Sequence, residues 1–142
     1  METTREKNIA AIKLFISFIE QKNIPAFLDL FADDAVQYNY FQCGMLPPEI
    51  RGKEALKEFW TPIPEKFSEM HFPIETIYPM LDPKFTAVKY HGNAKLKDSK
   101  TNYDNEYFAL FFFSEDGKIK EYHEYSNPVI TAKSFNMVDK IL

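Results

Sequence analysis

The sequence predicts an α+β fold, in which helices come first and a meander of long antiparallel strands follows. Helical spacing of apolar residues fills most of residues 3–69, whereas extended patterns dominate from residue 72 onward. Extended runs cover residues 35–41, 72–81, 85–96, 103–113 and 118–125. Helices grouped before the strand meander, instead of alternating with the strands, are typical of α+β domains.

The first helix is predicted from its cap and its apolar spacing. Thr3 and Glu6 form a capping box, in which Thr3 caps the helix and Glu6 reaches back to the backbone. Apolar residues then recur three and four positions apart, and we expect the helix to end near Lys22.

A second, shorter helix is predicted directly afterwards. Asn23 can cap it, and Pro25 is tolerated in its first turn because the missing N–H has no partner there. This helix should end near Ala32. We therefore expect Asp33 and Asp34 to serve the turn that follows it.

The third helical pattern starts after Gly52 and is interrupted by prolines. Pro62 and Pro64 conflict with a continuous helix, so we expect a break there and a resumed turn at residues 65–69. The tail, residues 132–142, is expected to form a short helix.

The last third of the chain predicts a β-hairpin. Asp116 and Gly117 form a tight-turn signal between two extended runs. The first of these strands is apolar on both faces over residues 108–113, so both faces should be covered. We expect a second copy of the chain to cover the outer face, which would make the protein a homodimer.

Length and composition indicate one domain, residues 1–142, with a substantial core. Of the 142 residues, 45% are hydrophobic and 16% are aromatic, enough to fill a core and line an apolar cavity. The net charge is −4 and no block of lysines and arginines occurs, which argues against nucleic acid as a partner.

Cysteine and histidine usage predicts neither an internal disulfide nor a metal site. Cys43 is the only cysteine, and no two histidines have the spacing of metal ligands. We expect no metal and no cofactor. The sequence has no signal-peptide pattern and no apolar run of membrane-spanning length, so we expect a cytoplasmic protein that does not contact membranes.

Several motifs resemble the SnoaL-like branch of the NTF2-like superfamily. They are Tyr-Asp-Asn-Glu-Tyr at residues 103–107, Asp-Gly-Lys-Ile at 116–119 and Glu-Tyr-Ser-Asn-Pro at 124–128, with residues 31–36, 51–53 and 82–83 agreeing in order. Within that branch, the chain is most similar to the phenazine-biosynthesis A/B proteins. The resemblance implies a cone, in which N-terminal helices pack in the concave face of a curved, mainly antiparallel sheet.

The resemblance also implies a catalytic acid/base at Glu124, which stands just before the aromatic-x-Asn-Pro segment. A carboxyl group among aromatic side chains is desolvated, which raises its pKa towards neutrality and suits proton transfer. The alternative is an exposed carboxylate on an outer sheet face. Strand alternation places Glu124 with Tyr122 and puts His123 on the opposite face, where it would form a surface or interface pair with Glu121.

Aromatic and amide side chains are the candidates for binding the substrate. Aromatic rings offer stacking surface, and their polar groups orient a ligand. The candidates are Tyr38, Tyr40, Trp60, Tyr103, Asn105, Tyr107 and Tyr122. For any one of them, ordinary core packing is the alternative.

Two positions depart from enzymes that share this fold. Ketosteroid isomerases carry a base Asp where this chain has Asn39, and asparagine cannot take a proton from carbon. The first helix also lacks the tyrosine of their oxyanion hole. The phenazine A/B proteins carry a His in the third helix, where this chain has Phe59.

These features predict that the protein binds a small apolar or aromatic cyclic ligand. As an enzyme, it would be a cofactor-independent isomerase, cyclase or condensing enzyme that uses Glu124 as acid/base. The alternative is a non-catalytic ligand carrier or a dimerisation module, because one fold hosts many functions.

Overall fold

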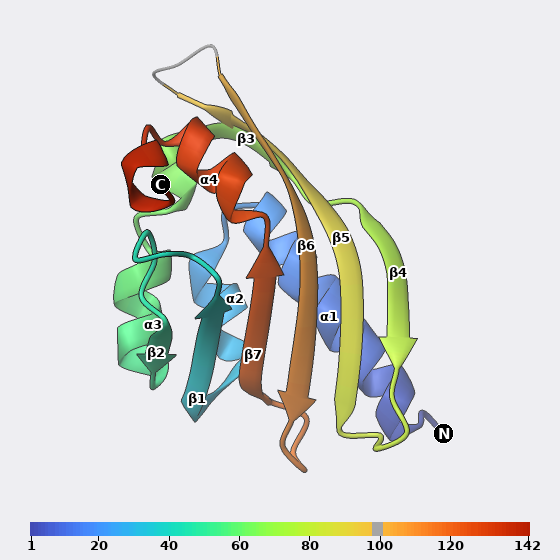
Figure 1. The fold of residues 1–142 in the computed structure, drawn as a ribbon. Helices are drawn as coiled ribbons and strands as arrows, with labels where there is room; N and C mark the ends of the chain where they lie inside the picture. The colour runs from blue at the N-terminus through green and yellow to red at the C-terminus, as the bar shows by residue number, and fades with distance from the viewer. Residues whose placement is uncertain (98–100) are drawn as a thin grey trace.

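A curved sheet wraps around one long helix in the computed structural model, which describes residues 1–97 and 101–142 (Figure 1). The helices are α1 (Thr4–Glu20), α2 (Ile24–Asp29), α3 (Lys53–Trp60) and α4 (Pro128–Ser134), with 3-10 turns η1 (Pro64–Lys66) and η2 (Val138–Lys140). The strands are β1 (Phe31–Tyr40), β2 (Glu49–Arg51), β3 (Phe67–His71), β4 (Ile74–Pro79), β5 (Phe85–Leu96), β6 (Asn102–Phe113) and β7 (Ile119–Ser126).

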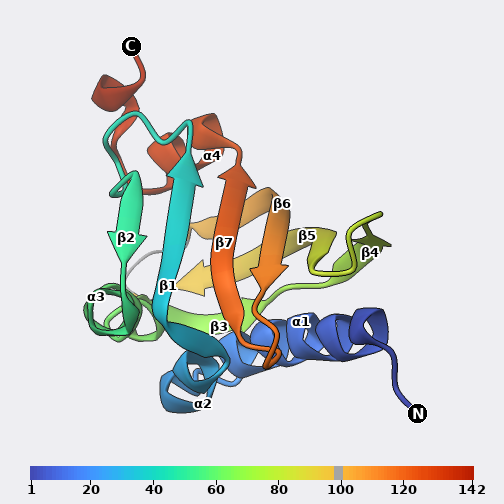
Figure 2. The ribbon, with the colours of Figure 1, turned by 90° about the horizontal axis from the view of Figure 1, so that it is seen from below.

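The sheet has seven strands in the order β2-β1-β7-β6-β5-β3, and β4 pairs with the other half of β5. The β1–β7 pair is parallel, and the other strand pairs are antiparallel. The long helix α1 lies behind the sheet in Figure 1, and Figure 2 shows how strongly the strands bend around it. The predicted α+β class, with helices in the concave face of a curved and mainly antiparallel sheet, is confirmed.

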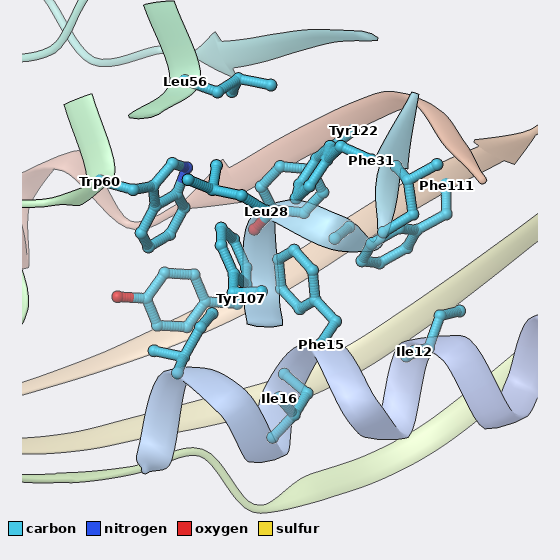
Figure 3. Close-up of a cluster of buried hydrophobic side chains, with 14 of the residues drawn as sticks. Ile12, Phe15, Ile16, Leu28, Phe31, Leu56, Trp60, Tyr107, Phe111 and Tyr122 are labelled. Atoms are coloured by element: carbon cyan, nitrogen blue, oxygen red, sulfur yellow. The ribbon is translucent and has the colours of Figure 1, made fainter. Parts of the chain in front are cut away.

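The core forms where α1 meets the concave face of the sheet. The predicted capping box at Thr3 and Glu6 is present, and α1 ends at Glu20, slightly earlier than expected. Phe15, fully buried, packs edge-on against Phe111 with ring centroids 5.0 Å apart. Figure 3 shows its ring among aromatic side chains from β1, β6 and β7, with Leu28 of α2 nearby. Burying each such side chain stabilises the fold by about 1.5–3 kcal/mol.

The predicted hairpin is confirmed as the β6–β7 pair, with Gly117 in its turn at φ 82°. Along β6 the side chains alternate. Phe111 and Phe113 are buried in the core, whereas Phe108 on the outer face is 43% exposed. Within the described residues, no helix lies over the outer side of β7, β6 and β5 (Figure 1). A cover for that face by a second chain stays a prediction.

Strand β4 lies within the expected run over residues 72–81, but a further strand, β3, precedes it. Strand β3 begins at Phe67, where a helical turn was expected, and it pairs with one end of β5. The Phe72 N–H then donates to the Glu20 carboxylate (2.8 Å), and Pro73 has no N–H, so the ladder stops there. Pairing with β5 resumes at Ile74 in β4.

Asp33 and Asp34 lie inside β1, which corrects the expectation that they serve a turn after a helix ending near Ala32. The second helix ends at Asp29, and β1 begins almost at once. Both aspartates are exposed where the β1–β7 register is irregular, and each lies 3.4 Å from a lysine, Lys53 for Asp33 and Lys120 for Asp34.

The tail also differs from the expectation of a helix over residues 132–142. Helix α4 starts earlier, at Pro128, because the Asn127 side chain caps it by accepting from the Val129 N–H. The turn expected around Asp98 and Ser99 lies outside the described residues. Among the helices that the structure describes, none has the length and apolar character needed to cross a bilayer.

Candidate ligand-binding cavity

A cavity of about 540 Å³ lies between the inner face of the sheet and the helices. Its volume is in the range of small-molecule sites. Apolar side chains form most of the wall: Ile19, Met45, Leu46, Phe59, Trp60, Pro62, Ile63, Phe67, Met70, Phe72, Ala94, Phe135 and Met137. Polar groups are contributed mainly by β5, β6 and β7 and by α4: Tyr90, Tyr103, Tyr107, Glu124, Ser126 and Thr131.

Glu124 lies on the inner face of β7 and lines this cavity. Desolvation in these surroundings raises the pKa of its carboxyl group from 4.5 to about 7, while a hydrogen bond from Tyr122 acts in the opposite direction. The other charged residues of the wall, Glu58 and Lys66, are exposed. Glu124 is therefore the carboxyl group of the wall that changes charge near neutral pH.

Buried tyrosines surround this carboxyl group. The hydroxyls of Tyr90 and Tyr122 lie 3.0 Å apart, and Tyr107 donates to the Tyr103 hydroxyl at 3.3 Å. The rings of Tyr90 and Tyr107 stack, with centroids 4.8 Å apart and an interplanar angle of 5°. Burial raises the pKa of Tyr90, Tyr107 and Tyr122 well above the usual value of 10. These hydroxyls consequently remain protonated and act as hydrogen-bond donors.

Asn105 supports this wall from behind. It is buried in β6, does not line the cavity, and donates to the Tyr103 hydroxyl at 2.8 Å. Its side-chain oxygen accepts from the Asn127 N–H at 3.1 Å. Asn105 therefore ties the start of α4 to β6 and fixes the position of Tyr103.

Trp60 is held against the cavity by a chain of side-chain amides. Its indole N–H donates to Gln37 (2.7 Å), Gln37 donates to Asn39 (3.0 Å), and Asn39 donates to the Pro47 carbonyl (2.9 Å). In the parallel register, Asn39 lies opposite Glu124. The residue in place of a ketosteroid isomerase base is thus an amide that links Trp60 to the loop after β1.

Tyr38 and Tyr40 do not line the cavity, which corrects their prediction as pocket residues. The parallel register pairs Tyr38 with His123 and Tyr40 with Tyr125, so these side chains share the outer face. The rings of Tyr38 and His123 stack with centroids 4.6 Å apart, and those of Tyr40 and Tyr125 with centroids 4.5 Å apart. Because β1 pairs with β7 in this register, the amide side chains of β1 point inward and its tyrosine side chains point outward.

His123 is a member of an outer-face network. Its Nε2 lies 2.8 Å from the Glu121 carboxylate and its Nδ1 lies 2.9 Å from the Tyr40 hydroxyl. The sheet separates this network from Glu124. His123 and Glu124 do not share a cavity, in keeping with strand alternation.

Of the predicted site residues, Trp60, Tyr103, Tyr107 and Glu124 come together in the cavity wall. Tyr122 is fully buried and lies behind the wall, because its ring fills the core against Phe15. The sequence reasoning did not identify Tyr90, Phe67, Phe72, Ser126 or Thr131 as cavity residues. Alternation along residues 85–96 and 118–126 is the signal that places Tyr90 and Ser126 inward.

The described residues contain no group of three His, Cys, Asp or Glu side chains arranged as metal ligands. Phe59, which stands where the phenazine A/B proteins carry a histidine, lines the cavity. A ligand would therefore meet an aromatic ring there, and the tyrosine hydroxyls, Glu124 and Ser126 on the opposite, sheet-facing wall.

Comparisons with known proteins agree with this architecture. A family model described as the SnoaL-like domain matches residues 12–122. The uncharacterised protein YesE of Bacillus subtilis (strain 168) is 22% identical over 131 residues, which cover 92% of this chain and 88% of YesE.

Solved structures share the fold over nearly the whole chain. A Bacillus subtilis protein provisionally described as an isomerase superposes with a TM-score of 0.88 at 20% identity, covering 95% of this chain and 96% of that one. The phenazine biosynthesis-related protein PhzB2 of Pseudomonas aeruginosa gives 0.80 at 22% identity, covering 94% and 83%. At such identities the likeness establishes a common fold.

Two further neighbours are known in the presence of small molecules. TerC, crystallised with polyporic acid, has a TM-score of 0.78 at 15% identity and covers 92% of this chain and 98% of its own. RV0760c of Mycobacterium tuberculosis, in complex with estradiol-17beta-hemisuccinate, has a TM-score of 0.72 at 16% identity and covers 87% and 96%.

Proposed function

Because the chain belongs to the SnoaL-like domain family, we propose that its cavity binds a small, partly apolar cyclic metabolite on which Glu124 acts as acid and base. The reaction would be an isomerisation or a condensation that needs no cofactor. Neighbours of the same fold include a provisional isomerase and a phenazine biosynthesis-related protein, and two others hold small molecules. These neighbours support the proposal that the ligand is a small molecule.

One observation carries the proposal: a carboxyl group with a pKa of about 7 in the wall of an apolar cavity. At neutral pH both of its protonation states are populated. A single group can then remove a proton from one atom of a ligand and return it to another. The protonated tyrosines nearby supply donors for a developing negative charge.

A non-catalytic ligand carrier is the second candidate, and one observation favours it. Within the described wall, Glu124 has no second carboxyl, histidine or lysine side chain in the interior, since Phe59 fills the position of the family histidine and Glu58 and Lys66 are exposed. A carrier would bind the same ligands and transfer no proton.

A panel of rigid cyclic ketones, with 1-indanone first, separates the two candidates. Binding is followed by the fluorescence of Trp60, which is the only tryptophan of the chain and lines the cavity. Proton transfer is followed by NMR as exchange of the ketone α-hydrogens in D2O. We expect wild type to bind and to accelerate exchange, and Glu124→Gln to bind without accelerating it. Binding by wild type without exchange identifies a carrier.

We also propose that residues 1–142 act as one domain and pair as a homodimer through the outer face of the sheet. Supporting this, Phe108 and Tyr78 remain 43% exposed there, although their rings lie 6.2 Å apart on neighbouring parts of the sheet. An apolar face of this kind is characteristic of interaction surfaces.

A further inference from the structure

Gln42, just after β1, is a buried amide with a defined orientation. It is 4% exposed, and its nitrogen donates to the Tyr40 carbonyl at 3.2 Å and to the Ser126 hydroxyl oxygen at 2.9 Å. Rotating the amide by 180° would bring its oxygen against the Tyr40 carbonyl, so two acceptors would face each other. The amide nitrogen therefore faces Ser126 and the Ser126 oxygen accepts from it, while the side-chain oxygen of Gln42 has no hydrogen-bond partner among the described residues.

The loop that carries Gln42 is strained on both sides of it. Phe41 and Cys43 have positive φ angles of 59° and 50°, which non-glycine residues adopt at a cost of about 1–3 kcal/mol each. The buried amide offsets part of this cost by anchoring the loop to β7. The backbone carbonyl of Gln42 also accepts from the Met45 N–H at 2.8 Å, and Met45 lines the cavity.

The bond from Gln42 determines what Ser126 offers to a ligand. With a lone pair of its oxygen occupied, the hydroxyl proton of Ser126 points elsewhere. Within the described residues, that hydroxyl donates no hydrogen bond to the protein. Ser126 lines the cavity and stands two residues after Glu124 on the same face of β7.

We propose that Ser126, oriented by Gln42, donates a hydrogen bond to a ring carbonyl oxygen of the ligand, while Glu124 exchanges a proton with the neighbouring carbon. This inference rests on the proposed function and narrows its substrate class to cyclic ketones and enones. Gln42 is a positioning residue in this arrangement, and Ser126 contacts the ligand.

The spacing along the strand matches such a ligand. Residues two apart on one face of a strand are separated by about 7 Å. A carbon and the oxygen of an adjacent carbonyl lie about 2.4 Å apart, and a hydrogen bond between two oxygens adds about 2.7 Å. A ring that presents a C–H to Glu124 and its carbonyl to Ser126 fits between them.

The proton transfer balances without any further reagent. The Glu124 carboxylate takes a proton from the carbon next to the carbonyl, and the C–H electron pair forms a C=C bond. The π pair of the carbonyl moves onto the carbonyl oxygen, which becomes negatively charged. The Ser126 O–H stabilises this charge by a hydrogen bond and keeps its own proton. In the second step the oxygen pair re-forms the C=O bond and the C=C pair takes back the proton from Glu124, at the original carbon or, in a conjugated ring, at another one.

The test compares 1-indanone, labelled with ¹³C at the carbonyl, with indane, which has the same rings and no oxygen. Affinity is measured through Trp60 fluorescence and the carbonyl stretch by infrared difference spectroscopy. We expect the stretch of bound 1-indanone to shift downward in wild type. Ser126→Ala should remove this shift and weaken 1-indanone binding about five- to tenfold, with indane unchanged. Gln42→Leu should broaden and reduce the shift.

Thr131→Val is the matched control, because the Thr131 hydroxyl lines the cavity but already donates to the Asn127 carbonyl (3.3 Å). This variant should keep the shift. If both probes bind and Ser126→Ala leaves the shift intact, the inference about Ser126 is wrong and the proposed cavity function stands. If neither probe binds wild type, both the inference and the proposed ligand class are overturned.

Discussion

The hydroxyls of Tyr90 and Tyr122 lie 3.0 Å apart in the buried interior, and Tyr122 also acts on the Glu124 carboxyl group by lowering its pKa against the effect of desolvation. One phenol thus connects the core of the sheet to the acid/base candidate. Because the hydrogen bond from Tyr122 favours the charged carboxylate, it holds the pKa of Glu124 below the value that burial alone would produce.

Replacing Tyr122 by Phe should therefore raise the pKa of Glu124 further. The Tyr90 hydroxyl would also lose its partner, at a cost of about 1–3 kcal/mol in the free energy of unfolding. The pH dependence of urea unfolding reports both effects, as a lower plateau and a midpoint displaced to higher pH. A midpoint displaced to lower pH would show that Tyr122 does not stabilise the carboxylate.

Glu124→Gln should remove a specific pH dependence of stability. The folded-state pKa of Glu124 lies above its unfolded value, so the folded state binds this proton more tightly. The associated stability is fully present below pH 4.5 and is lost as pH rises through about 7. The loss is at most about 3 kcal/mol.

Unfolding free energies from pH 4 to 8 for wild type and Glu124→Gln check this prediction. The difference between the two proteins should change steadily in favour of the variant between pH 4.5 and 7. Glu69→Gln, at an exposed position of β3, is the control. Parallel curves for wild type and Glu124→Gln would mean that Glu124 is an ordinary solvated carboxylate.

Gly92 on β5 has no room for a side chain. A Cβ at this position would lie 2.7 Å from the Tyr107 ring and 3.1 Å from the Phe72 ring, and both rings line the cavity. We expect Gly92→Ala to displace them, to lower stability by about 1–3 kcal/mol and to alter the Trp60 response to cyclic ketones. Asn93→Ala, at the exposed neighbouring position, should do neither. Wild-type stability and binding in Gly92→Ala would contradict the packing of these rings.

A homodimer through the outer sheet face is tested by sedimentation equilibrium at micromolar concentration. Wild type should sediment as a dimer, and Phe108→Asp should shift it towards the monomer by placing a charge in the apolar face. Leu14→Asp is a control of similar exposure, since Leu14 is 46% exposed on α1 and Phe108 is 43% exposed. A monomeric wild type would show that the outer face stays uncovered.

Local signals predicted much of the fold. The Asp116-Gly117 turn located the hairpin, and the strand predicted over residues 85–96 has the bounds of β5. Strand β3 was missed because a helical turn was expected at residues 65–69, and the break at Pro73 that separates β3 from β4 was missed with it. The end of the β3–β5 pairing depends on Glu20, which is distant in sequence and accepts a hydrogen bond from the Phe72 N–H.

The residues of the candidate site could be predicted only where alternation along a single strand determines which face a side chain is on. Glu124 and Tyr122 follow from the phase of β7. Tyr38 and Tyr40 were misplaced because the inward face of β1 carries Gln37 and Asn39, which look like surface residues until their hydrogen bonds to Trp60 and Pro47 are known. Register against a parallel neighbour is a long-range property that residues 31–40 do not encode alone.

The most direct measurement of the central claim is the pKa of Glu124 itself. Protein labelled with ¹³C at the glutamate carboxyl is titrated by NMR from pH 3 to 9, and the Glu124 signal is assigned as the one that Glu124→Gln removes. The desolvated, partly buried carboxyl group predicts a midpoint near 7. A midpoint near 4.5 would show that water solvates Glu124, and it would contradict both the apolar environment of this group and its role as acid/base.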